Sequence, residues 1–551
     1  MRNAIVQTLI APYGGTLKSL LVNGEAAAGL RREALGLPSI ELDWRQTAEL
    51  EMLLNGAYSP LSGYMGQAEV RSVQENFRLA DGVTFWPAPV TLKVREKAAA
   101  GLAVGGRAAL RDAEGYMLAV LELSDLWPAT ENGWVHLGGA LAGVDLPPRH
   151  DFRELRLSPS ELRASFARRG WHRVAAYQAR HAMHRAQYEF CLRTAIAEEA
   201  NLLLHPWAGG DMVESGDYFS LARSYQAVLQ RFPSATTQLA LLPGLPPPAS
   251  ARDVLLRAIV ARNYGCAVLI IGGEFQPEGE CRRGEDIVHP RADFDPAAQA
   301  LALGVKLIAF PRLVYCEDRG EFLPVGEVPP GARARALAGD EFMRRLREGQ
   351  KIPEWYSFPE VIAELQKACP PREKQGFTVF FTGLSGAGKS TLARALAARL
   401  MEIGSRPVTL LDGDIVRRHL SSELGFSREH RDINVLRIGF VASEITKNRG
   451  VAICAPIAPY RHTRRDVRAM IEAVGGFIEV HVATPIETCE ARDRKGLYAK
   501  ARAGLIPEFT GVSDPYETPE KAELAIDTSD LSVDEAVQRI LLKLEHEGYL
   551  R

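Results

Sequence analysis

A glycine-rich segment has the residue types and spacing that bind the phosphates of a nucleotide. Residues 383–391 read GLSGAGKST and fit the pattern G-x-x-x-x-G-K-[ST], between an apolar run (377–382) and the helix-forming run TLARALAARLME. In such a strand–loop–helix setting, backbone N–H groups converge on phosphate oxygens and the helix N-terminus favours negative charge. Lys389 would reach the γ-phosphate of ATP, and Ser390 would ligate Mg²⁺. The predicted ATP and Mg²⁺ contacts are Gly383, Leu384, Ser385, Gly386, Ala387, Gly388, Lys389, Ser390 and Thr391.

Two carboxylates follow the next strand-like run, RPVTLL (406–411). They are Asp412 and Asp414, and ligands bind in parallel sheets at the carboxyl ends of the strands. One carboxylate could hold metal-bound water while the other accepts the proton of an acceptor hydroxyl, as kinase catalysis requires. Arg417 would then contact a charged group of the acceptor. The alternative is that these aspartates are a helix N-cap and a surface residue.

Four more motifs follow the loop and the LDGD sequence in a fixed order. They are LGFSREHRDINVLRIG (424–439), ICAPIAPYR (453–461), DRKGLYAKARAG (493–504) and EFTGVSDPYE (508–517). With these motifs, residues 377–551 resemble adenylylsulfate kinase (APS kinase). That family phosphorylates the 3′-hydroxyl of adenosine 5′-phosphosulfate (APS) to give 3′-phosphoadenosine 5′-phosphosulfate (PAPS).

The resemblance implies a role for individual residues. Asp414 would be the base for the 3′-hydroxyl, and Asp412 would support the water shell of the magnesium ion, which Ser390 also binds. The remaining implied APS contacts are the phosphosulfate-binding Arg417, Arg431, Asn434 and backbone of Ile457, the adenine-stacking Phe426 and Phe509, and the lid residues Lys495, Gly496 and Leu497.

Two positions depart from the kinase family. Ala458 stands where many members have serine, and Ile415 replaces a frequent asparagine. Alanine cannot accept a phosphoryl group, but direct in-line transfer to the bound hydroxyl does not need such an acceptor. We therefore expect the kinase to be active.

The N-terminal three-fifths of the chain resembles ATP sulfurylase (sulfate adenylyltransferase), which makes APS from ATP and sulfate. The resemblance rests on IAPYGGTL (10–17), LNGAYSPLSGYM (54–65), WPAPVTL (86–92), LLLHP (202–206), RNYGC (262–266) and GDEFMRRLREGQKIPEWYSFPEV (339–361). Short apolar runs alternate with helix-length segments after Val174, as in a parallel α/β sheet. The expected fold is a multi-domain α/β chain with a β-rich, PUA-like domain (1–165), a Rossmann-like nucleotidylyltransferase domain (166–325), a small α subdomain with a linker (326–371) and a P-loop kinase domain with a parallel sheet (372–551).

The catalytic motifs of the sulfurylase family are altered in this chain. The family pattern Q-[TS]-R-N-P-x-H-x-x-H keeps Gln178, Arg180 and His184, but Gln187 replaces the second histidine. The family sequence GRDHAG becomes GGEFQP (272–277), and the M-R-x-x-G-P loop falls within PPPASA (246–251). Losing charge and proton-transfer groups from such a site commonly costs about 10² or more in rate for each group. We therefore predict a sulfurylase-like domain without activity, in which Gln178, Arg180 and His184 form a remnant site. These three residues either still bind an anion or make only ordinary structural hydrogen bonds, and the second reading is favoured.

Composition excludes several other classes. The chain has 551 residues, 66 Lys+Arg against 68 Asp+Glu and a net charge of -2, which argues against a general nucleic-acid binder. Its seven cysteines include no CxxC pair, so neither a disulfide framework nor a zinc site is expected. We read no signal peptide and no apolar stretch that could span a membrane, and so we expect a cytoplasmic protein without a membrane partner. The family relation implies a homo-oligomer, either a dimer or a hexamer.

Three functions from different classes remain open at this point. The first is an APS kinase fused to an inactive sulfurylase scaffold. The second is a bifunctional PAPS synthetase with both activities. The third gives the N-terminal region a non-catalytic role, in assembly or in nucleotide binding that regulates the kinase.

Overall fold

The chain folds into two compact units. The computed structural model describes residues 8–207, 217–245, 250–271, 295–425, 427–493 and 496–550, without the side chains of residues 217 and 414. The first unit runs to Ala338 and also takes in Ile352–Ala368, and the second consists of Gly339–Lys351 and the chain from Cys369 onward. Among the described residues, no helix combines the length and the apolar character that a membrane span needs.

The N-terminal part of the first unit is built on a largely antiparallel sheet. Its path is β1-β4-β5-β6-β2, with β3 also paired to β6. The segment RAALRDAEGYMLAVLEL (107–123) predicts a hairpin with its turn at AEG (113–115), and β4 and β5 form this hairpin. The expected β-rich domain also contains helices, because amphipathic segments cover the sheet. The elements are α1 (Gly24–Glu33), β1 (Ser39–Glu41), α2 (Trp44–Leu54), β2 (Gly63–Tyr64), α3 (Gln67–Asn76), β3 (Leu92–Arg95), β4 (Arg107–Arg111), β5 (Met117–Pro128) and β6 (Trp134–Gly143).

A parallel five-stranded sheet with the order β11-β10-β7-β8-β9 forms the rest of this unit's core. The chain moves outward from β7 to one side and then returns to β10 on the other side, so a topological switch point lies between the carboxyl ends of β7 and β10. The predicted strand–helix alternation is confirmed. The elements are η1 (Arg153–Leu155), α4 (Pro159–Arg168), β7 (Val174–Gln178), α5 (Arg185–Ala197), β8 (Asn201–Leu204), α7 (Asp217–Leu229), β9 (Thr237–Leu239), α8 (Ala251–Asn263), β10 (Val268–Ile271), α9 (Pro296–Ala302) and β11 (Lys306–Ala309).

A small antiparallel sheet and one further helix complete the first unit. Strand β12 pairs with both β13 and β14. The elements are β12 (Leu313–Cys316), β13 (Glu321–Pro324), η3 (Val325–Glu327), β14 (Ala334–Arg335) and α11 (Pro359–Ala368). The segment GDEFMRRLREGQKIPEWYSFPEVIAEL (339–365) predicts two short helices around a proline-marked break. These helices are α10 (Gly339–Glu348) and α11, and they belong to different units.

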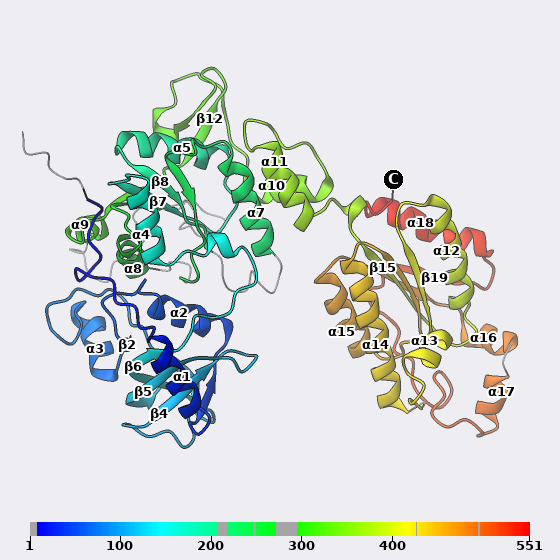
Figure 1. The fold of residues 1–551 in the computed structure, drawn as a ribbon. Coiled ribbons are helices and arrows are strands. Elements are labelled where there is room, and N and C mark those ends of the chain that lie inside the picture. The colour runs from blue at the N-terminus through cyan, green and yellow to red at the C-terminus, as the bar shows by residue number, and fades with distance from the viewer. Residues whose placement is uncertain are drawn as a thin grey trace, which may run out of the picture. The chain divides into compact units, whose positions relative to one another are not determined.

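The second unit is a five-stranded parallel sheet between two layers of helices (Figure 1). The strand order is β16-β17-β15-β18-β19, so the strand that leads into the phosphate loop lies at the centre. The elements after α10 are η4 (Arg372–Lys374), β15 (Phe377–Thr382), α12 (Lys389–Ile403), β16 (Val408–Asp412), α13 (Gly413–His419), α14 (Arg428–Lys447), β17 (Val451–Ala455), α15 (Arg461–Glu472), β18 (Gly476–Val482), α16 (Ile486–Arg492), α17 (Leu497–Arg502), β19 (Leu524–Ile526) and α18 (Val533–His546).

The apolar run 377–382 becomes the central strand because it can bury side chains on both faces. Every residue of β15 is buried. Phe377, Val379 and Phe381 pack in the core beneath α12 and α18, whereas Phe380 packs in the core beneath α14 and α15. Alternate side chains of a strand point to opposite faces, so this one run supplies both helix layers.

Helices α14 and α15 approach closely at a glycine. A Cβ atom on Gly439 would lie 2.7 Å from Cγ2 of Val467, which is closer than side chains pack. Position 439 therefore has no room for a larger side chain unless the helices separate.

We predict that Gly439→Val lowers the free energy of unfolding of the second unit by about 2–3 kcal/mol, because overpacking forces these helices apart. Glu444→Val, on the exposed face of the same helix, is expected to change it by about 0.5 kcal/mol or less. Calorimetry or denaturant titration measures both. Equal stability of the two variants would contradict the close contact.

Candidate functional site

The phosphate loop adopts a conformation that requires glycine. Gly383, Gly386 and Gly388 have φ values of 148°, 76° and 104°, in the region that L side chains rarely adopt. A Cβ on Gly383 would also lie 2.6 Å from the carbonyl oxygen of Val482. The loop thus turns sharply between β15 and the N-terminus of α12, which begins at Lys389.

The lysine of the motif is buried against the loop. Lys389 Nζ donates to the carbonyl oxygens of Gly383 at 2.9 Å and Leu384 at 2.7 Å. These bonds place its ammonium group on the loop itself, and Ser390 and Thr391 follow in the first turn of α12. The structure therefore brings the predicted loop residues together around one helix N-terminus.

Side chains distant in sequence hold the loop from outside. The hydroxyls of Thr484 and Thr528 donate to the carbonyl oxygen of Ala387 at 3.2 and 3.0 Å. The hydroxyl of Tyr498 donates to the carbonyl oxygen of Ser385 at 2.9 Å. Sequence reasoning missed both threonines, which carry no recognisable signal. It placed Tyr498 in the lid, as part of the sequence GLY (496–498), but not against the phosphate loop.

The predicted acidic pair lies at the end of strand β16, which is separated from β15 by β17. Asp412 is buried, 4% exposed, and its carboxylate lies 3.5 Å from the guanidinium of Arg394. Asp414 lies in the first turn of α13, but its side chain is outside the described part of the structure. Arg417 Nη1 donates to the carbonyl oxygens of Leu424 and Gly425 at 3.3 and 3.0 Å, so it holds the turn that follows α13.

A cluster around Arg431 joins α14 to the segment 508–517. The guanidinium pairs with Asp514 at 2.5 Å and donates to the carbonyl oxygen of Glu508. It also donates to the hydroxyls of Tyr460 and Thr510, both at 3.2 Å. Arg431 therefore joins the motif 424–439 to the motif 508–517. Its contact with phosphosulfate stays a prediction.

Asn434 lies one turn further along α14. Its side chain is buried, and its Oδ1 atom has no hydrogen-bond partner among the described residues. A buried polar atom without a partner is costly, and a bound ligand would supply one. This observation supports the predicted role of Asn434 in substrate binding.

Two of the remaining implied APS contacts, Ile457 and Phe509, lie in the described part of the chain. The carbonyl oxygen of Ile457 accepts from Thr382 Oγ1 at 2.7 Å and from the N–H of Gly383 at 3.3 Å. Phe509 packs edge-on against Tyr498, with ring centroids 5.1 Å apart. Phe426, the predicted second adenine contact, lies outside the described residues.

The described part of the predicted lid begins at a helix start. Gly496 has a φ of 65° and caps α17, which begins at Leu497. The N–H groups of Leu497 and Ala499 donate to Asp493 at 2.8 and 3.0 Å. These backbone hydrogen bonds, that of Ala499 foremost, lower the pKa of Asp493. Lys495, the predicted lid cation, is outside the described residues.

A second polar site lies at the switch point of the first unit. Gln178 ends β7 and is buried, and its Oε1 accepts from Arg257 Nη1 at 3.2 Å. His205 follows β8 and is fully buried against the ring of Tyr264, with centroids 4.7 Å apart. Neither ring nitrogen of His205 has a hydrogen-bond partner among the described residues. Burial, with a smaller contribution from Arg257, lowers the pKa of His205 to about 3.

The other retained sulfurylase residues lie on the same edge. Arg180 stacks over the ring of Trp207, 4.7 Å from its centroid. His184 caps α5, and its Nδ1 lies 2.8 Å from the hydroxyl of Ser357. Burial and then the neighbouring His181 lower the pKa of His184 to about 4. Gln187 accepts from the N–H of His184 at 3.2 Å, which is a capping role.

Sequence reasoning missed Arg257 and Ser357, which lie far from the motif along the chain. The altered motif segments 272–277 and, in part, 246–251 fall outside the described residues.

These features define the class of protein: a phosphate-loop nucleotide-binding unit joined to an α/β unit with a polar site at its switch point. Family models match in three parts, a PUA-like domain at residues 10–134, ATP-sulfurylase at 153–368 and adenylylsulphate kinase at 375–527.

Relatives match along the whole chain. The sulfate adenylyltransferase of Emericella nidulans is 42% identical, over 98% of this chain and 99% of that protein. That of Neurospora crassa is 40% identical over the same shares. A solved structure described as a hexameric APS kinase from Thiobacillus denitrificans is 60% identical, with a TM-score of 0.86 and 99% of each chain covered. The chain belongs to the sulfate adenylyltransferase family, in the form that fuses ATP sulfurylase and APS kinase domains.

The buried histidine predicts how the stability of the first unit depends on pH. His205 has a pKa of about 3 when folded, against about 6.5 when unfolded, so the unfolded state binds its proton first as pH falls. The contribution of the neutral His205 to the free energy of unfolding is fully present above about pH 6.5 and is lost progressively as the pH falls toward 3. His205 alone should cost about 2 kcal/mol between pH 7 and pH 5.

His205→Phe keeps a ring against Tyr264 and removes the titration, so its thermal midpoint should fall less over this range than that of the wild type. His172→Gln, at an exposed position, is the control and should follow the wild type. The same decrease in all three proteins would contradict the buried neutral ring.

Proposed function

We propose that the chain transfers the γ-phosphate of ATP to the 3′-hydroxyl of APS, giving PAPS and ADP. The observation that carries this proposal is the loop that places Lys389 at the start of α12, at the same carboxyl edge of the sheet as Asp412, within a domain that matches adenylylsulfate kinase. The substrates are small molecules, and the proposal involves neither nucleic acid nor a membrane.

In this proposal, the phosphates of ATP take the place of the loop carbonyls as partners of Lys389. The residues at the site also fit Mg²⁺, because Ser390 and Asp412 supply the oxygen donors that this hard cation prefers. Bound with ATP, Mg²⁺ neutralises charge between the β- and γ-phosphates. Asp414 accepts the proton of the 3′-hydroxyl of APS. The oxygen of that hydroxyl bonds to the γ-phosphorus of ATP while the bond between this phosphorus and the leaving oxygen of ADP breaks.

The acceptor side of the site is also proposed. Arg417, Arg431, Asn434 and the backbone at Ile457 hold the phosphosulfate, since guanidinium groups suit such anions. Phe426 and Phe509 stack on the adenine. Lys495, Gly496 and Leu497 form the lid over both nucleotides.

We predict that Lys389→Ala lowers the rate of PAPS formation by about 10² or more, because the transferred phosphate loses the positive charge of the Lys389 ammonium group. Lys447→Ala, an exposed change in the same unit, is the control and should keep wild-type activity. We propose a homo-oligomer, since the 60% identical relative is described as hexameric, and both variants should elute as the wild type does. Wild-type PAPS formation by Lys389→Ala would overturn the assignment of the loop.

A second candidate activity is sulfate adenylyltransfer in the first unit. The relatives in Emericella nidulans and Neurospora crassa are named sulfate adenylyltransferases, which favours an active bifunctional enzyme. The altered motif and the neutral, capping His184 favour the loss of activity that the sequence predicts. A non-catalytic nucleotide-binding role for this unit is the third reading.

A paired assay on the full chain decides between them. One arm follows PAPS formed from APS and MgATP, and the other follows ATP formed from APS and pyrophosphate. The altered motif predicts PAPS without ATP in the wild type. ATP formation that persists in Lys389→Ala and disappears in Arg180→Ala would establish an active sulfurylase. APS binding to the first unit without turnover would support the third reading.

The proposed domain boundaries, after residues 165, 325 and 371, and the cytoplasmic location remain predictions.

A further inference from the structure

The segment that follows β17 has an unusual backbone. Ala458 is buried and has a φ of 45°, in the left-handed region that alanine rarely adopts. A residue persists in that region only when its surroundings hold it there. The segment directly follows the strand next to β15, so it borders the phosphate loop.

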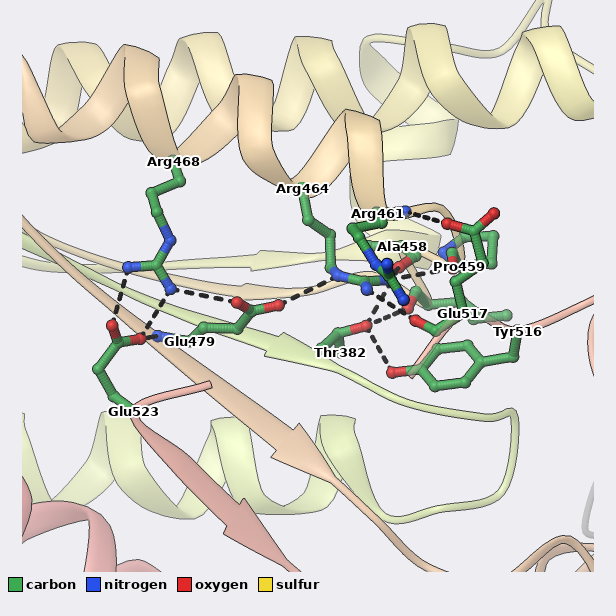
Figure 2. Close-up of polar contacts among 11 residues, drawn as sticks. Thr382, Ala458, Pro459, Arg461, Arg464, Arg468, Glu479, Tyr516, Glu517 and Glu523 are labelled. Atoms are coloured by element: carbon green, nitrogen blue, oxygen red, sulfur yellow. Dashed lines mark hydrogen bonds and ion pairs between the residues drawn. The ribbon is translucent and has the colours of Figure 1, made fainter. Parts of the chain in front are cut away.

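Three successive carbonyl groups of this segment are held by hydrogen bonds. The carbonyl oxygen of Ile457 accepts from Thr382 Oγ1 at 2.7 Å. Those of Ala458 and Pro459 accept from Arg464 Nη1 at 2.7 and 3.0 Å (Figure 2). The N–H groups of Ile457 and Ala458 donate to no residue in the described part of the chain. The segment therefore keeps two backbone donors for an anion.

Arg464 supplies most of this restraint from inside the protein. Its side chain is 3% exposed and projects from α15 toward the sheet (Figure 2). Besides the two carbonyl groups, Nη2 donates to the carbonyl oxygen of Glu517 at 2.7 Å, and Nε lies 3.1 Å from Glu479 Oε1. A buried guanidinium is costly unless its donors are satisfied, and here most of them reach backbone oxygens.

Glu479 braces this arginine from β18. Its other carboxylate oxygen lies 3.1 Å from Arg468 Nη2, and its N–H donates to Glu523 at 2.7 Å. Arg468 pairs with Glu523 at 2.8 Å and contacts none of the three carbonyl groups within the described chain. Arg464 and Arg468 thus share one acid, but of these two only Arg464 reaches the segment beside the phosphate loop (Figure 2).

We propose that Arg464, braced by Glu479, is a positioning residue that sets the backbone of residues 457–459 for binding the phosphosulfate of APS. The inference rests on the proposed kinase function. It assigns substrate positioning to a buried ion pair that would otherwise be part of the core.

The test compares Arg464→Lys with Arg468→Lys in the full chain, by steady-state PAPS formation and by thermal unfolding. Lysine keeps the charge but lacks the planar guanidinium that reaches the carbonyl groups of Ala458, Pro459 and Glu517 and the carboxylate of Glu479 together. Arg464→Lys should raise the KM for APS about tenfold, because the hydrogen bonds that hold the backbone of residues 457–459 are weakened. The KM for MgATP should change less than about threefold. Arg468→Lys should lower the thermal midpoint without changing the KM for APS.

An unchanged KM for APS in Arg464→Lys, or an equal rise in both variants, would overturn the proposal and leave Arg464 a structural residue. If Arg464→Lys does not fold, Glu479→Gln is measured instead. A higher KM for APS at unchanged KM for MgATP supports the proposal, and an unchanged KM for APS overturns it. A wild-type protein that forms no PAPS would overturn the kinase function itself, which separates the two failures.

Discussion

The parallel pairing of β15 with β17 and β18 is the constraint on which the kinase site depends. It aligns Phe380 with Cys454 and Thr382 with His481, so the carboxyl ends of the strands lie at one edge. There the buried hydroxyl of Thr382 contacts the carbonyl oxygens of Ile457 and Ala458 and the hydroxyl of Tyr516. One side chain thereby joins the phosphate loop to two distant segments. A shift in register would move Thr382 to the other face and separate them.

The candidate sites of the two units use polar groups differently. In the second unit, the half-buried Arg431 pairs with Asp514 and the buried Arg464 pairs with Glu479, and both arginines also hold the backbone. In the first unit, burial keeps His184 and His205 neutral at physiological pH. Neutral imidazoles give no positive charge to an anion, although each can still donate one hydrogen bond. The two sites therefore differ in charge as well as in fold.

Sequence reasoning recovers the features that depend on local pattern. Clear periodicity or glycine spacing marks the phosphate loop, the strand before it, the hairpin with its turn at 113–115 and the parallel strands of both α/β domains. It misses Thr484 and Thr528, because a lone threonine near the loop depends on how β18 and β19 end in space. The partner of Arg431 was equally invisible, since Asp514 lies in another motif and meets it only through folding. The β-rich description of the N-terminal domain overlooked the three helices against its sheet.

The path of the chain between the units has a practical result. Helix α10 belongs to the second unit, yet Ile352–Ala368, which follow it, belong to the first. The backbone therefore passes between the units at 338–339, at 351–352 and again at 368–369. A protease cut or gene truncation near residue 369 would strip the kinase part of a helix that packs with it. No single cut between residues 338 and 369 therefore separates the two units without taking a segment from one of them.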